Sequence, residues 1–131
     1  MTGRAGAIAA ARGAVGVRFR LHGREPAFGL DCVGLAAVAA RAAGFTGAIP
    51  ADYAIRGADP SAAIDATALV RVAPPAPGDL LLFAAGPAQF HLAILVAGGI
   101  VHADAMLRRV VERPGPLPWP LIAAWRFEQE N

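Results

Sequence analysis

A chain of 131 residues, 56% of them hydrophobic and 17% charged, has too much apolar content for an intrinsically disordered segment. Its twelve basic residues are all arginine and are scattered along the chain, and a net charge of +2 excludes the basic stripe that nucleic-acid-binding proteins carry. A single cysteine excludes an internal disulfide and a cysteine-based zinc site, and we expect neither a metal nor another cofactor.

The length fits one domain with one core, and we expect residues 1–131 to form it. The alanine-rich run 5–11 lacks the bulky apolar residues of a secretory signal and is followed by Arg12, so it predicts a first helix. No apolar run reaches the roughly 18 residues that a membrane span needs. We therefore expect a protein that is made in the cytoplasm and does not cross a membrane.

Two segments surround the only cysteine. Residues 15–28 are rich in glycine and arginine and lack helical periodicity, which predicts a loop. From Cys32 onward apolar residues recur at i, i+3, i+4 and i+7, and Gly44 stands where a C-terminal cap belongs. The sequence therefore predicts a helix over residues 32–43.

The second half of the chain changes from helix to sheet. Asp59 as N-cap and Pro60 at the first helical position predict a further helix that continues to about Val70. After the turn-forming stretch 73–78, short apolar runs predict strands. These strands cover residues 79–84, 89–97, 100–103, 108–112 and 121–127, with a proline-rich link at 115–120 before the last. Helices followed by antiparallel strands predict an α+β fold.

Cys32 stands where the loop turns into the helix. The unpaired N–H groups and the positive dipole end of a first helical turn favour a thiolate, so the position predicts a nucleophile with a pKa below the roughly 8.5 of a free cysteine. The alternative interpretation is a small buried apolar residue, which is the commoner role of an unpaired cysteine.

His91 and His102 lie on neighbouring predicted strands, and Gly98-Gly99 signals a hairpin between them. A two-residue turn at 97–98 and one at 98–99 both place the two histidines on the same face of the sheet. Only the turn at 97–98 makes them diagonal neighbours within side-chain reach, and we favour that register. The alternative is that both are packed or half-exposed strand residues without a catalytic role.

Together these residues suit a thiol hydrolase. Cys32 would attack a carbonyl carbon, while His91 would take the thiol proton and later protonate the leaving amine. His102 would orient the His91 ring through its other nitrogen. The backbone N–H of Cys32 could help to bind the oxyanion.

Four segments, in order, resemble motifs of the NlpC-type cell-wall peptidases, which are papain-like cysteine peptidases. They are Asp31-Cys32-Val33-Gly34-Leu35, Pro77-Gly78-Asp79-Leu80, His91-Leu92-Ala93-Ile94 and His102-Ala103. The resemblance implies a papain-like α+β fold, in which the nucleophile starts a helix that packs on a C-terminal antiparallel sheet. It also implies a triad of Cys32, His91 and His102 that cleaves peptide bonds in peptidoglycan stem peptides.

The resemblance also suggests substrate contacts. Asp31 would recognise the free amine of a stem peptide, and Phe19 stands where the family usually has a tyrosine. Arg20 and Arg24, on the loop before the nucleophile, could pair with stem carboxylates, although an exposed arginine is usually only solvated. We therefore expect cleavage between D-glutamate and the diamino acid, with a free N-terminal L-alanine required.

Valine after the nucleophile, where the family usually has serine, makes the chain similar to short variants encoded in phage-tail and gene-transfer-agent clusters. Phage-tail proteins are therefore possible partners, and incorporation into a phage-like tail is the expected destination. Two other functions stay open. One is a related thiol amidase or acyltransferase, which the same triad would serve, and the other is a non-catalytic module for tail assembly.

Several remaining residues favour structural interpretations. Asp79 is expected to stabilise the turn into its strand by accepting backbone N–H bonds. Trp119 and Trp125 are interpreted as packing residues, and His22 as a solvated loop residue.

Overall fold

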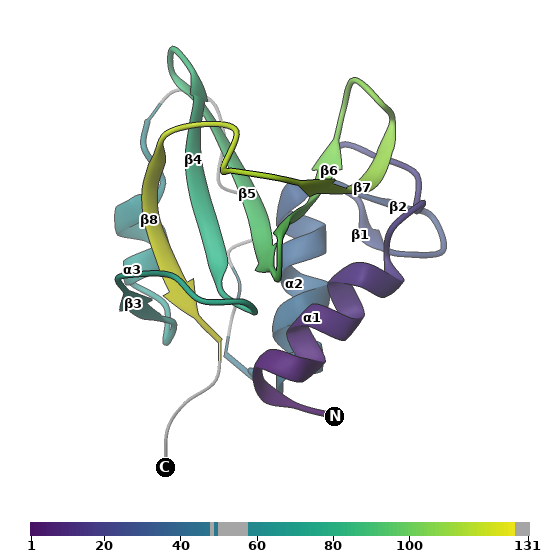
Figure 1. Ribbon diagram of the computed structural model, residues 1–131. Helices are drawn as coiled ribbons and strands as arrows, with labels where there is room; N and C mark the ends of the chain where they lie inside the picture. The colour runs from purple at the N-terminus through teal and green to yellow at the C-terminus, as the bar shows by residue number, and fades with distance from the viewer. Residues whose placement is uncertain (48, 50–57, 128–131) are drawn as a thin grey trace.

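Two helices packed against each other form one layer of the molecule (Figure 1). The computed structural model describes residues 1–47, 49 and 58–127. In it α1 (Gly3–Gly13) and α2 (Cys32–Ala43) approach so closely at Gly6 that a Cβ there would collide with the carbonyl oxygen of Ala42. Both helices confirm the sequence prediction. Gly44 ends α2 in the left-handed region, with φ 92°, as expected for a C-terminal glycine.

The third helix, α3 (Ser61–Asp65), is shorter than the sequence predicts. Its start is close to the prediction, because Asp59 accepts a hydrogen bond from the backbone N–H of Ser61 at 2.8 Å. Its end is not, because the Thr67 hydroxyl donates to the carbonyl of Ile64 at 2.6 Å and accepts from the N–H of Leu69 at 3.1 Å. These bonds replace helical ones, and the chain then turns into a strand.

Six antiparallel strands form the main sheet, in the order β3-β8-β4-β5-β6-β7 (Figure 1). They are β3 (Val70–Val72), β4 (Leu80–Gly86), β5 (Gln89–Val96), β6 (Gly99–Asp104), β7 (Arg109–Pro114) and β8 (Leu121–Arg126). All but β3 are predicted from the sequence. The predicted loop before Cys32 also contains a short ribbon of β1 (Arg24–Glu25) and β2 (Gly29–Leu30). Elements of two or three residues are too short to show a period, so the sequence does not reveal them.

The hairpin between β5 and β6 settles the register of the two histidines. Ile94 pairs with Val101 and Val96 with Gly99, which leaves residues 97–98 as the two-residue turn. This is the register that the sequence analysis favours. It places His91 and His102 on one face of neighbouring strands, as diagonal neighbours.

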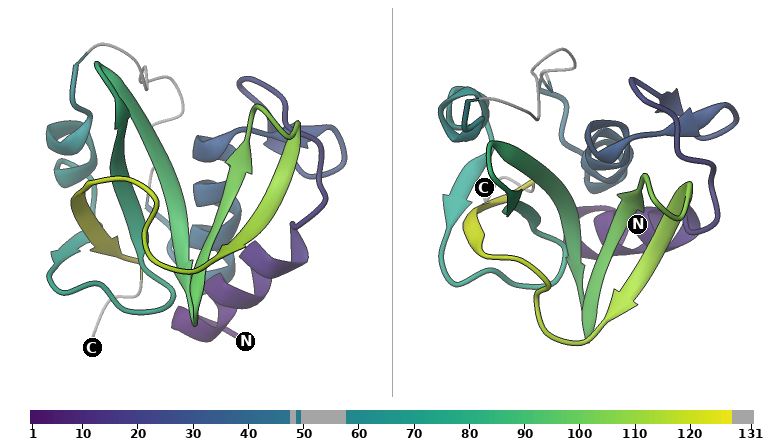
Figure 2. Two further views of the ribbon diagram at one scale, coloured as in Figure 1. Left: turned by 45° about the horizontal axis from the view of Figure 1, so that its top comes forward. Right: turned by 90° about the horizontal axis from the view of Figure 1, so that it is seen from above.

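The two long helices cover one face of β5 and β6 (Figure 2). Leu92, Ile94 and Val96 point into this interface and are at most 1% exposed, whereas His91 points to the opposite face. The start of α2 lies beside β5. Cys32 at this helix start and His91 on β5 line one cavity. The helices followed by an antiparallel sheet confirm the predicted α+β fold.

Candidate active site

Cys32 is the first residue of α2, as the sequence predicts, and only 2% of it is exposed. The helix begins there because Asp31 is a working N-cap, whose Oδ1 accepts a hydrogen bond from the backbone N–H of Gly34 at 2.8 Å. The backbone N–H groups of Cys32 and Val33 lie close enough to the sulfur to favour its thiolate form. The local structure therefore places a thiol at the positive end of a helix.

His91 and His102 form a hydrogen-bonded pair. His91 Nε2 lies 2.9 Å from His102 Nδ1, and the two rings are nearly perpendicular, at 89°. Because Nε2 of His91 is used in this bond, Nδ1 is the nitrogen that can accept a proton from the thiol. For Nδ1 to accept, Nε2–H must donate to His102 Nδ1, so the proton of His102 lies on its Nε2. With these tautomers, the pair would have the polarity of a base and its orienting partner.

A cavity of about 320 Å³ brings the thiol and both histidines together. Its wall is mostly apolar and comes from the loop before α2, from β4, β5 and β6, from the turn after β6 and from the link before β8. The lining residues are Phe19, Asp31, Cys32, Ala85, Gln89, His91, His102, Ala103, Asp104, Ala105, Met106 and Trp119. This cavity therefore holds the only cysteine of the chain together with the histidine pair.

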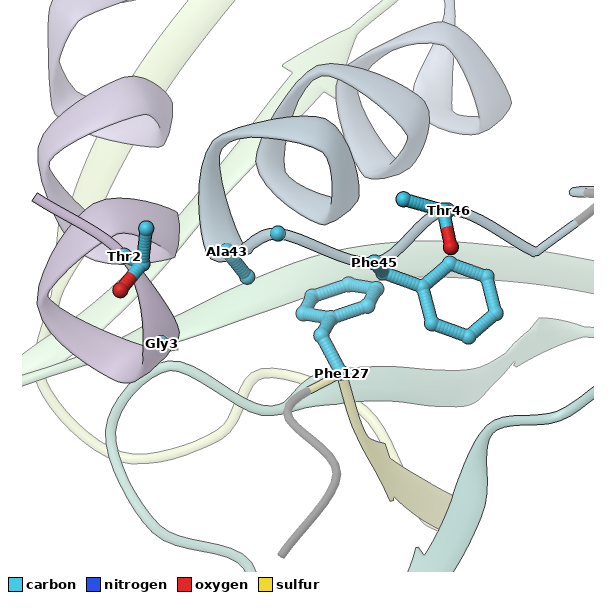
Figure 3. Close-up of a pocket in the computed structure, with 7 residues that line it drawn as sticks. Thr2, Gly3, Ala43, Phe45, Thr46 and Phe127 are labelled. Carbon is cyan, nitrogen blue, oxygen red and sulfur yellow. The ribbon is translucent and has the colours of Figure 1, made fainter. Parts of the chain in front are cut away.

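A second cavity, of about 370 Å³, lies at the opposite end of α2 (Figure 3). It is lined by Thr2, Gly3, Ala43, Gly44, Phe45, Thr46 and Phe127, and Figure 3 shows the Phe45 and Phe127 rings close to one another. None of these side chains is a titratable group or an activated nucleophile. The larger volume therefore does not mark the reactive site.

Two of the three predicted substrate-binding residues, Phe19 and Asp31, line the cavity of Cys32, whereas Arg20 does not. Phe19 lines the cavity of Cys32. Asp31 also lines it, but its carboxylate already accepts hydrogen bonds from Gly34, from the backbone N–H of His22 at 2.8 Å and from the Arg24 guanidinium at 2.7 Å. Arg24 already balances the charge of this carboxylate. The role of Asp31 in binding a substrate amine stays a prediction.

Arg20 and Arg24, on the loop before α2, do not line the cavity of Cys32. Arg24 turns inward to Asp31, and Arg20 is exposed and borders a separate depression of about 250 Å³ formed by the loop itself. Gly29, at φ 122°, returns the chain so close to Arg20 that a Cβ at Gly29 would collide with the Arg20 side chain. A contact between Arg20 and substrate would have to involve a group that extends beyond the cavity.

Burial is the largest cause of the pKa shifts of Cys32, His91 and His102. It raises the pKa of the Cys32 thiol to about 11, although the backbone N–H of Leu92 acts in the opposite direction. Burial also lowers the pKa of His91 to about 4, reinforced by His102 and opposed by the charge of Asp104. The predicted thiol pKa below about 8.5 is therefore wrong. The helix start that favours a thiolate is itself buried, so at neutral pH both Cys32 and His91 are uncharged.

This protonation state predicts slow alkylation. With a pKa of about 11, the thiolate is about 10⁻⁴ of Cys32 at pH 7, so labelling by iodoacetamide should be slow there and rise steeply with pH. Intact-protein mass spectrometry measures the rate on the only cysteine of the chain. The urea-unfolded protein is the control, because its thiol ionises near the ordinary value of about 8.5. A rate that is already maximal near pH 6 would instead reveal a thiolate–imidazolium pair.

Trp119 belongs to the site, although the sequence analysis interprets it as a packing residue. Its ring meets His91 at 5.3 Å and His102 at 5.7 Å between centroids, both edge to face. It also lines the cavity. Nothing local identifies it, because it lies in an irregular link that reaches the histidines only through the tertiary fold.

The described part of the chain shows neither a metal site nor a membrane span. Within residues 1–47, 49 and 58–127, no group of three or more histidine, cysteine, aspartate or glutamate side chains could hold a metal ion. In the same ranges, no helix combines the length and the hydropathy that crossing a bilayer requires.

The fold is similar to that of solved NlpC/p60 structures. The NlpC/p60 domain of the peptidoglycan hydrolase SagA matches with a TM-score of 0.59 at 23% identity, over 86% of this chain and 90% of that chain. NlpC1 from Trichomonas vaginalis matches with a TM-score of 0.61 at 18% identity and over 95% of this chain. NlpC2 from the same organism matches with a TM-score of 0.64 at 17% identity and over 99% of this chain.

The chain spans 44% and 48% of the lengths of the two Trichomonas chains. No family model matches the sequence, and no curated protein matches it. At these identities the likeness concerns the fold, and the chemistry has to be argued from the residues of this chain.

Proposed function

We propose that this chain is a cysteine peptidase that hydrolyses peptide bonds in peptidoglycan stem peptides. One observation carries the proposal: the thiol at the start of α2 and the hydrogen-bonded pair of His91 and His102 line one cavity. The similarity of the fold to NlpC/p60 structures, one of them a domain of a peptidoglycan hydrolase, supports the choice of substrate.

The first step forms a thioester. The Cys32 sulfur attacks the carbonyl carbon of the scissile bond while its proton passes to His91 Nδ1, so that no free thiolate has to accumulate in the buried site. His102 accepts from His91 Nε2 and stabilises the imidazolium as it forms. The developing oxyanion can accept the backbone N–H of Cys32, which lies at the helix start.

The second step releases the products. The imidazolium returns its proton to the leaving amine as the bond between the carbonyl carbon and nitrogen breaks. Water then attacks the thioester carbon and gives a proton to His91. As the carbon–sulfur bond breaks and the acid leaves, His91 returns that proton to the sulfur and the thiol is restored. The largely apolar wall of the cavity limits competing water around the histidines and strengthens these electrostatic interactions.

We propose that the bond cut is the one between D-glutamate and the diamino acid, in stems with a free N-terminal L-alanine. This bond comes from the resemblance to NlpC-type peptidases. The charge of Asp104, which lines the cavity, supports it, because a carboxylate suits an amine. Asp31 adds less, because Arg24 already balances its charge. Stem carboxylates would lie outside the cavity, toward Arg20.

The resemblance to short variants with an Asp-Cys-Val-Gly-Leu motif leads us to propose a phage-like tail as the setting of this activity. The related activity of an amidase or acyltransferase uses the same thioester and differs in the bond that is broken or in the acceptor. Product analysis separates these possibilities, whereas the site geometry is common to all of them.

Muropeptide mass spectrometry tests the proposal. The purified protein is incubated with stem peptides whose L-alanine is free, with N-acetylated stems and with stems still attached to sugar. We expect the dipeptide L-alanyl-D-glutamate only from free stems, and no product from the Cys32→Ala protein. Release of intact stems from the sugar, or equal cleavage of acetylated and free stems, would contradict the proposed bond. No product from any substrate would contradict the activity.

A further inference from the structure

We propose that Trp119 is a positioning residue that holds the His91–His102 pair in its perpendicular arrangement and keeps water from it. The indole contacts both imidazoles edge to face, with interplanar angles of 77° and 82°. A ring that touches only one histidine would leave the other free to rotate. Because Trp119 contacts both, it constrains the hydrogen bond between His91 Nε2 and His102 Nδ1 from one side.

The backbone around Trp119 restricts the position of its side chain. It lies between Pro118 and Pro120, whose rings restrict their own φ angles and disfavour helical conformations of the residues before them. The carbonyl of Pro120 accepts a hydrogen bond from the N–H of Ala84 at 3.0 Å, which attaches the link to β4. Figures 1 and 2 show this link crossing over the sheet between β7 and β8.

Side chains hold the indole as well. Phe83, which is fully buried, meets the Trp119 ring at 5.6 Å and 62°. The Arg113 guanidinium lies 5.7 Å from the ring centroid, in the range of a cation–π contact. The indole therefore has neighbours on β4 and β7 in addition to the two histidines.

The indole also separates the pair from solvent. The charged and titratable groups around the two imidazoles are Asp104 on β6, Arg113 on β7, and Cys32 and Asp31 at the start of α2. For both histidines, burial is the largest cause of the lowered pKa. The Trp119 ring is partly buried, meets both imidazoles and lines the cavity, so we expect its removal to expose the two histidines to water.

Histidine titration by NMR tests this role without any substrate. In Trp119→Ala, water reaches the pair, and the pKa of His91 should rise from about 4 to about 5 or higher. Trp119→Phe retains an aromatic wall and should give an intermediate value. Leu117→Ala is the matched control, because Leu117 lies on the same link, is 38% exposed and does not line the cavity. An unchanged His91 titration in Trp119→Ala would overturn the proposal.

The activity measurement rests on the proposed function, whereas the titration does not. On stem peptides, kcat of Trp119→Ala should fall roughly 10- to 100-fold through the loss of two ring contacts, with a smaller change in KM, and Trp119→Phe should recover most of the loss. An inactive wild-type protein would refute the function while the titration still decides the role of Trp119. If Trp119→Ala does not fold, Trp119→Phe becomes the test. An unchanged His91 pKa together with wild-type kcat in Trp119→Phe would then refute the positioning role of Trp119.

Discussion

His91→Ala is expected to lower kcat/KM for stem-peptide hydrolysis by about 10³- to 10⁴-fold at neutral pH. The size of this decrease follows from the protonation of the Cys32 thiol at neutral pH. Without a base, attack depends on the thiolate fraction of Cys32, which is about 10⁻⁴ at pH 7 for a pKa of about 11. The wild-type protein avoids this limit, because His91 removes the proton during the attack.

The dependence of kcat/KM on pH is a second test of His91 as the base. The pKa of His91 is lowered to about 4, so wild-type kcat/KM should be level through neutral pH and fall only as the solution approaches about pH 4, where His91 becomes protonated. In His91→Ala, the residual rate should instead rise about tenfold per pH unit toward the thiol pKa. Initial rates from about pH 4 to about pH 10 measure both curves.

His22→Asn is the matched control for the loss of a histidine. His22 is exposed on the loop before α2 and has a φ of 62°, a conformation that asparagine tolerates better than alanine. Its side chain does not line the cavity of Cys32, so activity should stay near that of the wild type. If His91→Ala keeps most of its activity, or loses no more than His22→Asn, the assignment of His91 as the base is wrong.

Arg126→Met is expected to lower the free energy of unfolding by about 3–5 kcal/mol. Asp79, directly before β4, is fully buried, and its carboxylate accepts two hydrogen bonds from Arg126, each at 3.0 Å. It also accepts the backbone N–H of Ala76 at 2.7 Å, which confirms its predicted role in the turn. Removing Arg126 leaves a buried carboxylate without its counter-charge, which costs far more than loss of the contact alone.

Urea unfolding at neutral pH, followed by tryptophan fluorescence, measures the loss. Arg12→Met is the control, because Arg12 and Glu112 form an exposed pair whose removal should cost about 1 kcal/mol or less. The double variant Asp79→Asn/Arg126→Met removes both charges and should recover part of the stability. A double variant less stable than Arg126→Met would contradict the argument from an uncompensated buried charge.

The sequence by itself determined the elements that depend on local interactions. The N-cap of Asp31, the apolar spacing from Cys32 onward and the terminal Gly44 specify α2, because each acts within a few residues along the chain. The same holds for the five longer strands. The alternation of side chains along a strand also places His91 and His102 on one face of the sheet, whichever of the two turns joins their strands.

The tertiary structure decided what depends on residues distant in the chain. It selected the turn at residues 97–98 and joined the start of α2 to β5. It also reversed the expected thiol pKa of Cys32, because desolvation depends on everything packed around a group and outweighs the favourable helix end. It turned Arg24 toward Asp31 and brought Trp119 over the histidine pair. Local patterns specify where a reactive residue stands, whereas burial and neighbours from other elements determine how it reacts.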